Sequence, residues 1–327
     1  RDAAAIAREI EDVGGHLNAY TARENTAYYA KVLKDDLPLA ADLLGDILTH
    51  STFVPEELER ERGVILQEIG QANDTPDDIV FDHFQAVCYG DQPMGRPTLG
   101  PADVIERMPR EALMGYMRRH YAPERMVVAA AGAVDHDALV DAVRARFADL
   151  PPPTEHAPEP ARWTGGEFRE ERDLDQVHVV LGFPGPGYGD PAHYPTMLLS
   201  SILGGGMSSR LFQEIRERRG LVYSIYSYHS PFRDGGQFAI YAGTGEDQAA
   251  ELVPATLEEL RRVQHDVSDD ELRRAKAQLR ASLLMAMEST GARCESIARQ
   301  LQVHGRIIPV DETKARIAAV TVEQVRE

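Results

Sequence analysis

The stretch PEELERERGVILQEI, residues 55–69, has the pattern of a long helix, and the rest of the chain can be read outward from it. Pro55 suits the first turn of a helix. Glu56 and Glu57 lie where the positive end of the helix dipole favours acidic side chains. The sequence DTP at 74–76 predicts where the helix ends.

Steps of three and four residues along this helix predict its buried face. The predicted stripe is Leu58, Glu61, Ile65, Glu68 and Ala72. Two of its members are glutamates seven residues apart, so they stack two turns apart on one face. An unpaired buried carboxylate is costly, and each glutamate should therefore have a partner or a metal ion. From the pattern alone, a solvated face on a charge-rich helix is an equally good interpretation.

The segment ERGVILQEI (61–69), preceded by PEEL (55–58), resembles the third-ligand helix of the pitrilysin/insulinase zinc peptidases, which have an inverted His-x-x-Glu-His motif. The resemblance covers essentially the whole chain. It is greatest to the bacterial half-length branch related to the mitochondrial processing peptidase. It implies Zn²⁺ as the cofactor, Glu68 as the third zinc ligand and Glu61 as a supporting acid of the catalytic site.

The chain departs from this family pattern in one respect. None of its eleven histidines lies in a His-x-x-Glu-His sequence. Counting back from Glu68 by the family's spacing, the motif falls upstream of Arg1. We therefore expect a family member whose two zinc histidines and general-base glutamate lie upstream, and we expect the chain alone to be inactive and to bind no catalytic zinc.

Composition excludes several classes of protein. The net charge is −18, from 35 basic and 53 acidic residues, and without a basic patch this argues against a nucleic-acid partner. Cys88 and Cys294 are too few for a disulfide framework or a cysteine zinc site. The longest apolar run, 126–134, is too short to span a bilayer. We expect a bacterial protein of the cytoplasm or the periplasm.

A chain of 327 residues predicts about two domains. Five prolines within 150–160 predict a stiff linker, assigned to 151–163. Residues 1–150 would form an N-terminal peptidase domain that lacks its first strands and the His-x-x-Glu-His helix. Residues 164–327 would form a homologous C-terminal domain. The expected fold is α+β, with two mainly antiparallel sheets, each with helices packed on one face, in a clamshell arrangement.

Two segments of the first half have parallels in the second, which indicates an internal repeat. They are EIEDVGG (9–15) with EIRERRG (214–220), and PEELER (55–60) with DDELRR (269–274). On this pairing Glu61 and Glu68 fall opposite Ala275 and Ser282, so the second copy has no metal-binding acids.

The alternating run HLNAYTA (16–22) predicts a strand, with 27–33 as its hairpin partner. The resemblance implies that this is the family's edge strand beside the zinc, where a peptide substrate adds as an extra strand. Asn18, Ala19 and Tyr20 are then candidate substrate-binding residues. Without the resemblance, Asn18 is a turn or edge residue with no ligand.

Arg216 and Tyr223 lie seven residues apart across a helix end that Gly220 caps. The pair resembles the Arg…Tyr signature of the family's second domain, where both groups reach toward the zinc-bound substrate. A guanidinium and a phenol suit stabilisation of a developing oxyanion. From the residues alone, an exposed arginine in a basic cluster with Arg218 and Arg219, and a tyrosine in a sheet, remain possible.

Periodicity predicts the remaining elements. Helices are expected at 1–13, 37–50, 79–88, 110–119, 135–147, 194–203, 211–219, 249–263, 269–287 and 295–301, and strands at the end of 121–130 and at 176–183, 223–228 and 237–242.

These patterns predict a zinc endopeptidase that cleaves peptides or unfolded segments in a chamber between two domains. It would act as a homodimer or as a heterodimer with a related subunit. The alternative is a non-catalytic partner or structural subunit of the same family, as in respiratory-complex cores. Glu61 and Glu68 argue against that alternative, because such a subunit has little need for both carboxylates.

Overall fold

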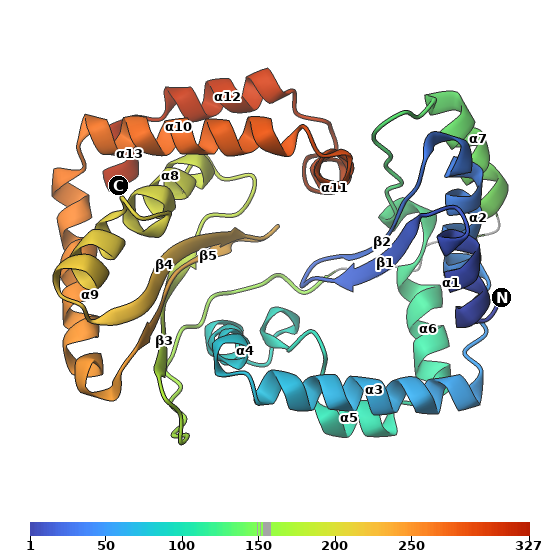
Figure 1. Cartoon of the computed structure of the whole chain (residues 1–327), viewed down its shortest axis with the longest axis horizontal. Helices are drawn as coiled ribbons and strands as arrows, with labels where there is room; N and C mark the ends of the chain where they lie inside the picture. Colours follow the sequence, from blue (N-terminus) through green and yellow to red (C-terminus); the bar gives the residue numbers. More distant parts are fainter. Residues whose placement is uncertain (149, 151, 153–157) are drawn as a thin grey trace. The chain divides into compact units, whose positions relative to one another are not determined.

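The computed structural model describes residues 1–148, 150, 152 and 158–327, and these form two compact units (Figure 1). The first unit consists of Arg1–Gly70, Thr98–Pro158 and Ala286–Ile307; the second consists of Gln71–Pro97, Glu159–Met285 and Ile308–Glu327. Each unit therefore joins segments from both halves of the chain. The division into 1–150 and 164–327 stays a prediction, and much of the predicted linker lies outside the described residues.

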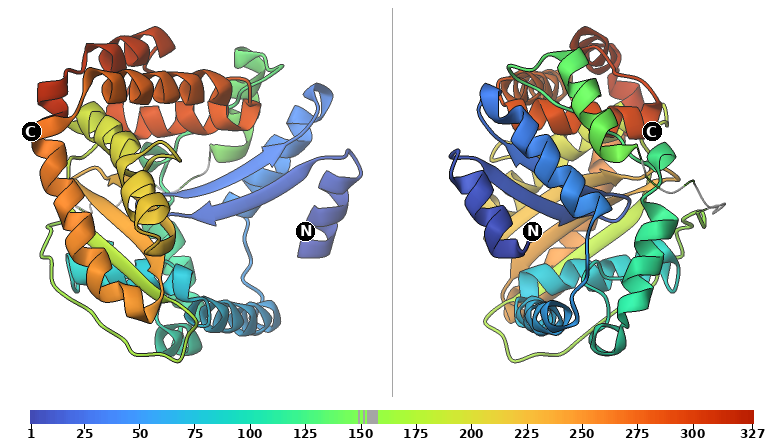
Figure 2. Two further views of the ribbon diagram at one scale, coloured as in Figure 1. Left: turned by 60° about the vertical axis from the view of Figure 1, so that its left-hand side comes forward. Right: turned by 90° about the vertical axis from the view of Figure 1, so that its right-hand side faces the viewer.

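Both units combine helices with antiparallel strands, so the predicted α+β class is confirmed (Figure 2). The described elements of the first unit are α1 (Ala3–Glu11), β1 (His16–Thr21), β2 (Thr26–Lys31), α2 (Leu37–Thr49), α3 (Pro55–Asn73, which runs on past Gly70), α5 (Ala102–Arg107), α6 (Arg110–His120), α7 (His136–Phe147) and α11 (Thr290–His304). The predicted hairpin is thus present as β1 and β2.

The hairpin of the first unit has a regular register, from His16 opposite Lys31 to Thr21 opposite Thr26. Its side chains alternate between the two faces of the pair. On one face, the Tyr28 and Tyr121 hydroxyl groups lie 2.9 Å apart. Burial and this hydrogen bond raise the pKa of Tyr121, so its phenol stays protonated.

The second unit contains α4 (Pro76–Tyr89), β3 (Val177–Gly185), α8 (His193–Gly204), the π-helix η4 (Phe212–Arg218), β4 (Val222–Pro231), β5 (Gly236–Thr244), α9 (Glu246–Asp266), α10 (Asp269–Ala286), α12 (Val310–Ala319) and α13 (Val322–Arg326). Helices α5, α12 and α13 are short and were not predicted. The three strands form one antiparallel sheet in the order β3–β5–β4.

Alternation along the strands of the second unit gives this sheet two covered faces. Ile225 and Ile240 belong to the main core, against which α8 and α9 pack. Tyr228 and Tyr241 point to the other face, where the ring of Phe81 on α4 lies 5.9 and 5.5 Å from theirs. The sheet is therefore the middle of three layers.

The predicted buried strand at the end of 121–130 is wrong. Residues 126–130 have no strand assignment, and Val128 is exposed. The apolar run suits a strand, but it forms no ladder of backbone hydrogen bonds with any described strand. Among the described residues, no helix combines the length and the apolar character that crossing a membrane requires.

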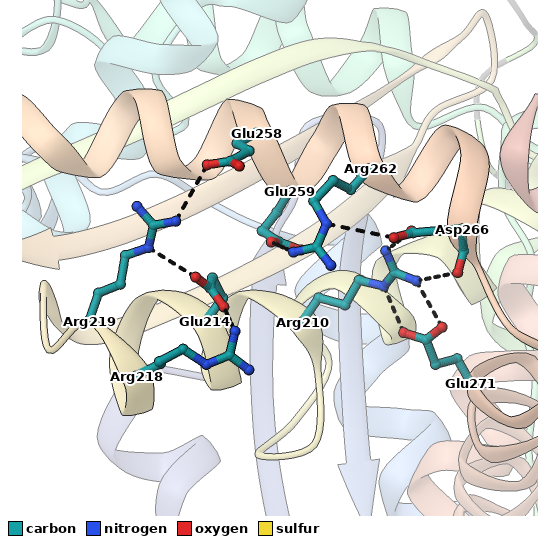
Figure 3. A network of polar contacts seen from close by, with 9 residues as sticks. All are labelled: Arg210, Glu214, Arg218, Arg219, Glu258, Glu259, Arg262, Asp266 and Glu271. Atoms are coloured by element: carbon teal, nitrogen blue, oxygen red, sulfur yellow. Dashed lines mark hydrogen bonds and ion pairs between the residues drawn. The ribbon is translucent and has the colours of Figure 1, made fainter.

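An ion-pair cluster ties η4 to α9 and α10 (Figure 3). The Arg210 guanidinium lies just before η4 and is largely buried. It donates from Nε and Nη2 to the two carboxylate oxygens of Glu271, at 2.6 and 2.8 Å. It also binds the carboxylate of Asp266 and the Asp266 carbonyl oxygen. Such bidentate, charge-assisted contacts are among the strongest in proteins.

The Glu271 carboxyl has a pKa of about 2, well below its ordinary value of 4.5. Burial raises this pKa, but hydrogen bonds from Arg210 and from the backbone and side chain of Ser268 outweigh the effect. Because folding lowers the pKa, the charged carboxylate stabilises the fold above pH 4.5. This contribution is lost as the pH falls from about 4.5 toward 2.

We expect Glu271→Gln to lower the free energy of unfolding by about 2 kcal/mol at pH 7, because a hydrogen bond to a charged group is lost. Urea unfolding at pH 7 and at low pH measures the difference, which should shrink as the pH approaches the folded pKa of about 2. Glu258→Gln is the matched control. The Glu258 carboxylate is mostly exposed, so this substitution should lower the free energy of unfolding by less than about 0.5 kcal/mol. A Glu271→Gln deficit that is unchanged at low pH would contradict this account.

Candidate functional site

Helix α3 begins at Pro55, has Glu56 and Glu57 in its first turn and ends at Asn73, as predicted. Glu61 and Glu68 lie on one face of this helix, about 10 Å apart along its axis at 1.5 Å per residue. The face is exposed, and Val64 between them is also exposed.

The prediction that Glu61 and Glu68 lie on the buried stripe is wrong, because both are exposed. The partly covered face consists of Leu58, Arg62, Ile65, Leu66, Ile69 and Ala72. Arg62 belongs to it because its guanidinium donates to the carbonyl oxygens of Ile105 and Met108. The covered face is thus rotated from the predicted one, and the two glutamates lie at its exposed border.

Neighbouring acids on α3 are neutralised by arginines of the same helix. Arg60 pairs with Glu57 at 2.6 Å, and Arg62 pairs with Glu59 at 3.1 Å. Within the described part of the chain, neither Glu61 nor Glu68 forms an ion pair or a side-chain hydrogen bond. These two carboxylates therefore remain available to a ligand.

The described residues include no group of three or more His, Cys, Asp or Glu side chains placed to hold a metal ion. A catalytic zinc takes three protein ligands, and carboxylate oxygen is one of the donors that it accepts. The unpaired Glu68 carboxylate suits one such position. The residues present thus fit a zinc site as one member of a donor set.

Strand β1 carries the three predicted substrate-binding residues, and Asn18, Ala19 and Tyr20 are all exposed. The pair β1–β2 is a two-stranded sheet in the described chain, so β1 has one open edge. The Ala19 amide donates to Asn18 Oδ1 at 2.8 Å, so an asparagine side chain occupies a backbone donor of this strand. The Tyr20 hydroxyl donates to Glu295 Oε1 at 3.2 Å.

Arg216 lies in η4, and Tyr223 lies directly after the first residue of β4. The pairing of β4 with β5 slips by one residue between Val222 and Ser224, so Tyr223 is the extra residue of a β-bulge. A bulge can re-aim a side chain, and Tyr223 is 78% exposed. Arg216 is also exposed.

A cavity of about 370 Å³ lies beside both residues within the second unit. It is lined by Arg216, Glu217, Gly220, Leu221, Val222, Tyr223, Gly245 and Gln248. The structure thus brings the predicted Arg216–Tyr223 pair to one pocket. Its cationic and phenolic donors suit a ligand with a carbonyl or carboxylate oxygen.

Comparisons with known proteins match both parts of the chain. Residues 1–102 match the family model described as insulinase (peptidase family M16), and residues 107–279 match the one described as the peptidase M16 inactive domain. The chain belongs to the insulinase family of peptidases. The resemblance inferred from residues 55–69 is therefore confirmed.

Relatives of this insulinase-family chain include an uncharacterized zinc protease of Streptomyces coelicolor, 42% identical over 336 residues, a match that covers 100% of this chain and 73% of the relative. A probable mitochondrial-processing peptidase beta subunit of Arabidopsis thaliana is 38% identical. The match covers 100% of this chain and 64% of that relative. Among solved structures, a protease from Helicobacter pylori matches with a TM-score of 0.90 and 19% sequence identity. The match covers 100% of this chain and 81% of that protease, and at this identity it supports only the likeness of fold.

The sequence interpretation missed the π-helix and the bulge that flank the pocket. One signal was present. In EIEDVGG a glycine follows Ile10 by four residues, whereas in EIRERRG the glycine follows Ile215 by five. That extra residue between the two copies marks the π turn. The bulge at Tyr223 has no such signal in the sequence.

We expect the 327-residue chain by itself to retain well under one zinc ion per molecule after dialysis, because Glu68 alone cannot supply about three protein ligands. Metal analysis by mass spectrometry measures this directly. Stoichiometric zinc held by Glu68 and a histidine of this chain would contradict the expectation, and Glu68→Gln would then identify the ligand.

Proposed function

We propose that the chain forms part of a zinc-dependent endopeptidase that cleaves peptides or unfolded protein segments. The observation that carries this proposal is the pair Glu61 and Glu68, two turns apart on the exposed face of α3 and without ion-pair partners in the described chain. This helix lies in the part that matches the insulinase peptidases. The relatives named as zinc proteases support the same reaction class.

Glu68 would be the carboxylate ligand of the metal, together with two histidines of a His-x-x-Glu-His segment that this chain does not contain. Zinc, when bound, supplies a Lewis acid and lowers the pKa of water. Glu61 would be a supporting acid that orients or neutralises groups near the ligands. Both roles need carboxylates that no arginine has neutralised, and α3 provides them.

The substrate would add to the open edge of β1 as a further strand, which fixes its backbone through main-chain hydrogen bonds. Asn18, Ala19 and Tyr20 would contact it. Since the Ala19 amide is bonded to Asn18 Oδ1, the Asn18 side chain must move aside before that amide can meet a substrate carbonyl. Side-chain caps of this kind also protect an open edge from unwanted pairing.

Arg216 and Tyr223 would donate to the oxygen of the scissile carbonyl as negative charge develops on it. The Tyr223 hydroxyl supplies a hydrogen bond and Arg216 supplies positive charge. Donors placed in advance stabilise the transition state more than the ground state, and they therefore raise kcat. Their common pocket in the second unit supports this joint role.

A second candidate is a non-catalytic partner subunit of the same family, paired with a related chain. The relative named as a processing-peptidase beta subunit favours a multi-subunit assembly, as homodimer or heterodimer. The placement of Glu61 and Glu68 two turns apart on one exposed face of α3, without ion-pair partners in the described chain, favours the enzyme.

In an enzyme that contains this chain together with a His-x-x-Glu-His segment, we expect Glu68→Gln to remove most of the bound zinc, because a neutral amide is a poor ligand. Glu61→Gln should lower activity with a smaller loss of metal. Zinc content and peptide cleavage measured on the same samples separate the two effects. A Glu68→Gln enzyme with normal zinc and normal turnover would show that the wrong acid has been assigned.

In the same enzyme, Tyr223→Phe should lower kcat by about 10²–10³-fold, the usual cost of losing one oxyanion donor. Zinc content and melting temperature should hardly change, because the exposed Tyr223 hydroxyl has no bonding partner in the described chain. Arg216→Ala should act in the same direction. Parent-rate cleavage by both variants would exclude this role for the second unit.

A further inference from the structure

The helix end between Arg216 and Tyr223 is one residue longer than its counterpart in the first unit. After α1, the Gly14 amide donates to the Glu11 carbonyl at 2.8 Å and the Gly15 amide to the Ile10 carbonyl at 2.9 Å, which is a Schellman cap. Gly14 has a φ of 66°, in the left-handed region. Strand β1 follows in regular register.

In the second unit the same cap is wider. The Gly220 amide donates to the Arg216 carbonyl at 3.1 Å, and the Leu221 amide donates to the Ile215 carbonyl at 3.0 Å, six residues back instead of five. Gly220 has a φ of 64°, so the glycine plays the same part. The additional residue is taken up in the π-helix η4, and such turns are frequent at functional sites.

Two of the three arginines at this π-helix, Arg218 and Arg219, belong to the ion-pair cluster drawn in Figure 3. Glu214 is largely buried, and its carboxylate pairs with Arg218 and, at 3.0 Å, with Arg219. Arg219 also reaches Glu258 on α9 at 3.4 Å. The pKa of Arg219 lies above its usual range, chiefly because Glu214 accepts its hydrogen bond. Both of these guanidinia therefore have a carboxylate partner, and they share that of Glu214.

Arg216 differs from its two neighbours. In the described chain it forms no ion pair, although Glu217 lines the same pocket. Its guanidinium carbon instead lies 4.6 Å from the centre of the Phe212 ring, one turn earlier in η4. A ring at this distance attracts the cation without neutralising its charge. Arg216 thus keeps its full charge beside the pocket and Tyr223.

We propose that Glu214 and Phe212 are positioning residues for Arg216. Glu214 pairs with Arg218 and Arg219, and Phe212 holds the Arg216 guanidinium at the pocket, so that one arginine of the three is left to meet the substrate oxygen. The inference deepens the proposed function and rests on it for the identity of the ligand. The distribution of charge itself can be tested without any activity.

The first experiment uses the 327-residue chain and an arginine-selective dicarbonyl, phenylglyoxal, with modification at each site followed by peptide mass spectrometry. Arg216 should react several-fold faster than Arg218 and Arg219, because it has no carboxylate partner. In Glu214→Gln, the rate at Arg218 should rise several-fold toward that of Arg216, whereas the rate at Arg219, which also contacts Glu251 and Glu258, should rise less. The control Glu258→Gln should leave Arg218 unchanged. Equal rates at the three sites in the parent chain would overturn the inference.

The second experiment measures peptide cleavage by an enzyme that contains this chain and a His-x-x-Glu-His segment. Glu214→Gln and Phe212→Leu should each lower kcat about tenfold, with KM changed less than about twofold, because a transition-state contact is displaced. Phe212→Tyr keeps the aromatic ring next to the Arg216 guanidinium, so this variant should retain the kcat of the parent enzyme. The melting temperature of Phe212→Leu should stay close to that of the parent enzyme, which separates this positioning role from a loss of ring packing.

Arg216→Ala separates failure of this inference from failure of the proposed function. If Arg216→Ala lowers kcat while Glu214→Gln and Phe212→Leu retain it, the positioning role is wrong and the oxyanion role stands. If Arg216→Ala cleaves at the parent rate, the oxyanion role is wrong, and the modification rates still decide whether Glu214 sets the charges of the cluster.

Discussion

The candidate site of the second unit depends on how firmly η4 is held to its neighbours. Arg210, just before the π-helix, is fixed by Asp266 and Glu271, and Arg219, just after it, reaches Glu258. The start of η4 is thus tied to the end of α9 and the start of α10 through a largely buried guanidinium, whereas the contact of Arg219 with the exposed Glu258 adds little (Figure 3). Partly buried carboxylate–guanidinium pairs with several hydrogen bonds resist displacement. This restraint fixes the start of the π-helix against its neighbours.

In both units, some charged side chains of one helix have ion-pair partners and others in the same helix have none in the described chain. On α3, Glu57 and Glu59 have arginine partners, whereas Glu61 and Glu68 have none in the described chain. On η4, Glu214 takes two arginines and leaves Arg216 unpaired. In both cases the paired side chains lie three to five residues apart in the sequence, and Glu61 and Glu68 on α3 and Arg216 on η4 are left without such a partner.

The sequence predicted the limits of α3 well because Pro55 and the DTP segment act locally. It did not predict which face is covered, because that depends on Arg62 binding the carbonyl oxygens of Ile105 and Met108, far along the chain. The strand expected at the end of 121–130 failed for a similar reason. Strand propensity was present, but a strand also needs a neighbour, and propensity does not supply one.

The Arg216–Tyr223 pair was predicted, yet the geometry that presents it was not. A π turn and a β-bulge each add one residue to the regular element. The hydrophobic periodicity of the sequence does not predict either insertion. The corresponding turn between α1 and β1 has neither insertion, so a helix–glycine–strand corner of this kind folds without them. The two irregularities are therefore not a requirement of the corner. Arg216 lies in the π turn and Tyr223 in the bulge, and both of these residues line one pocket.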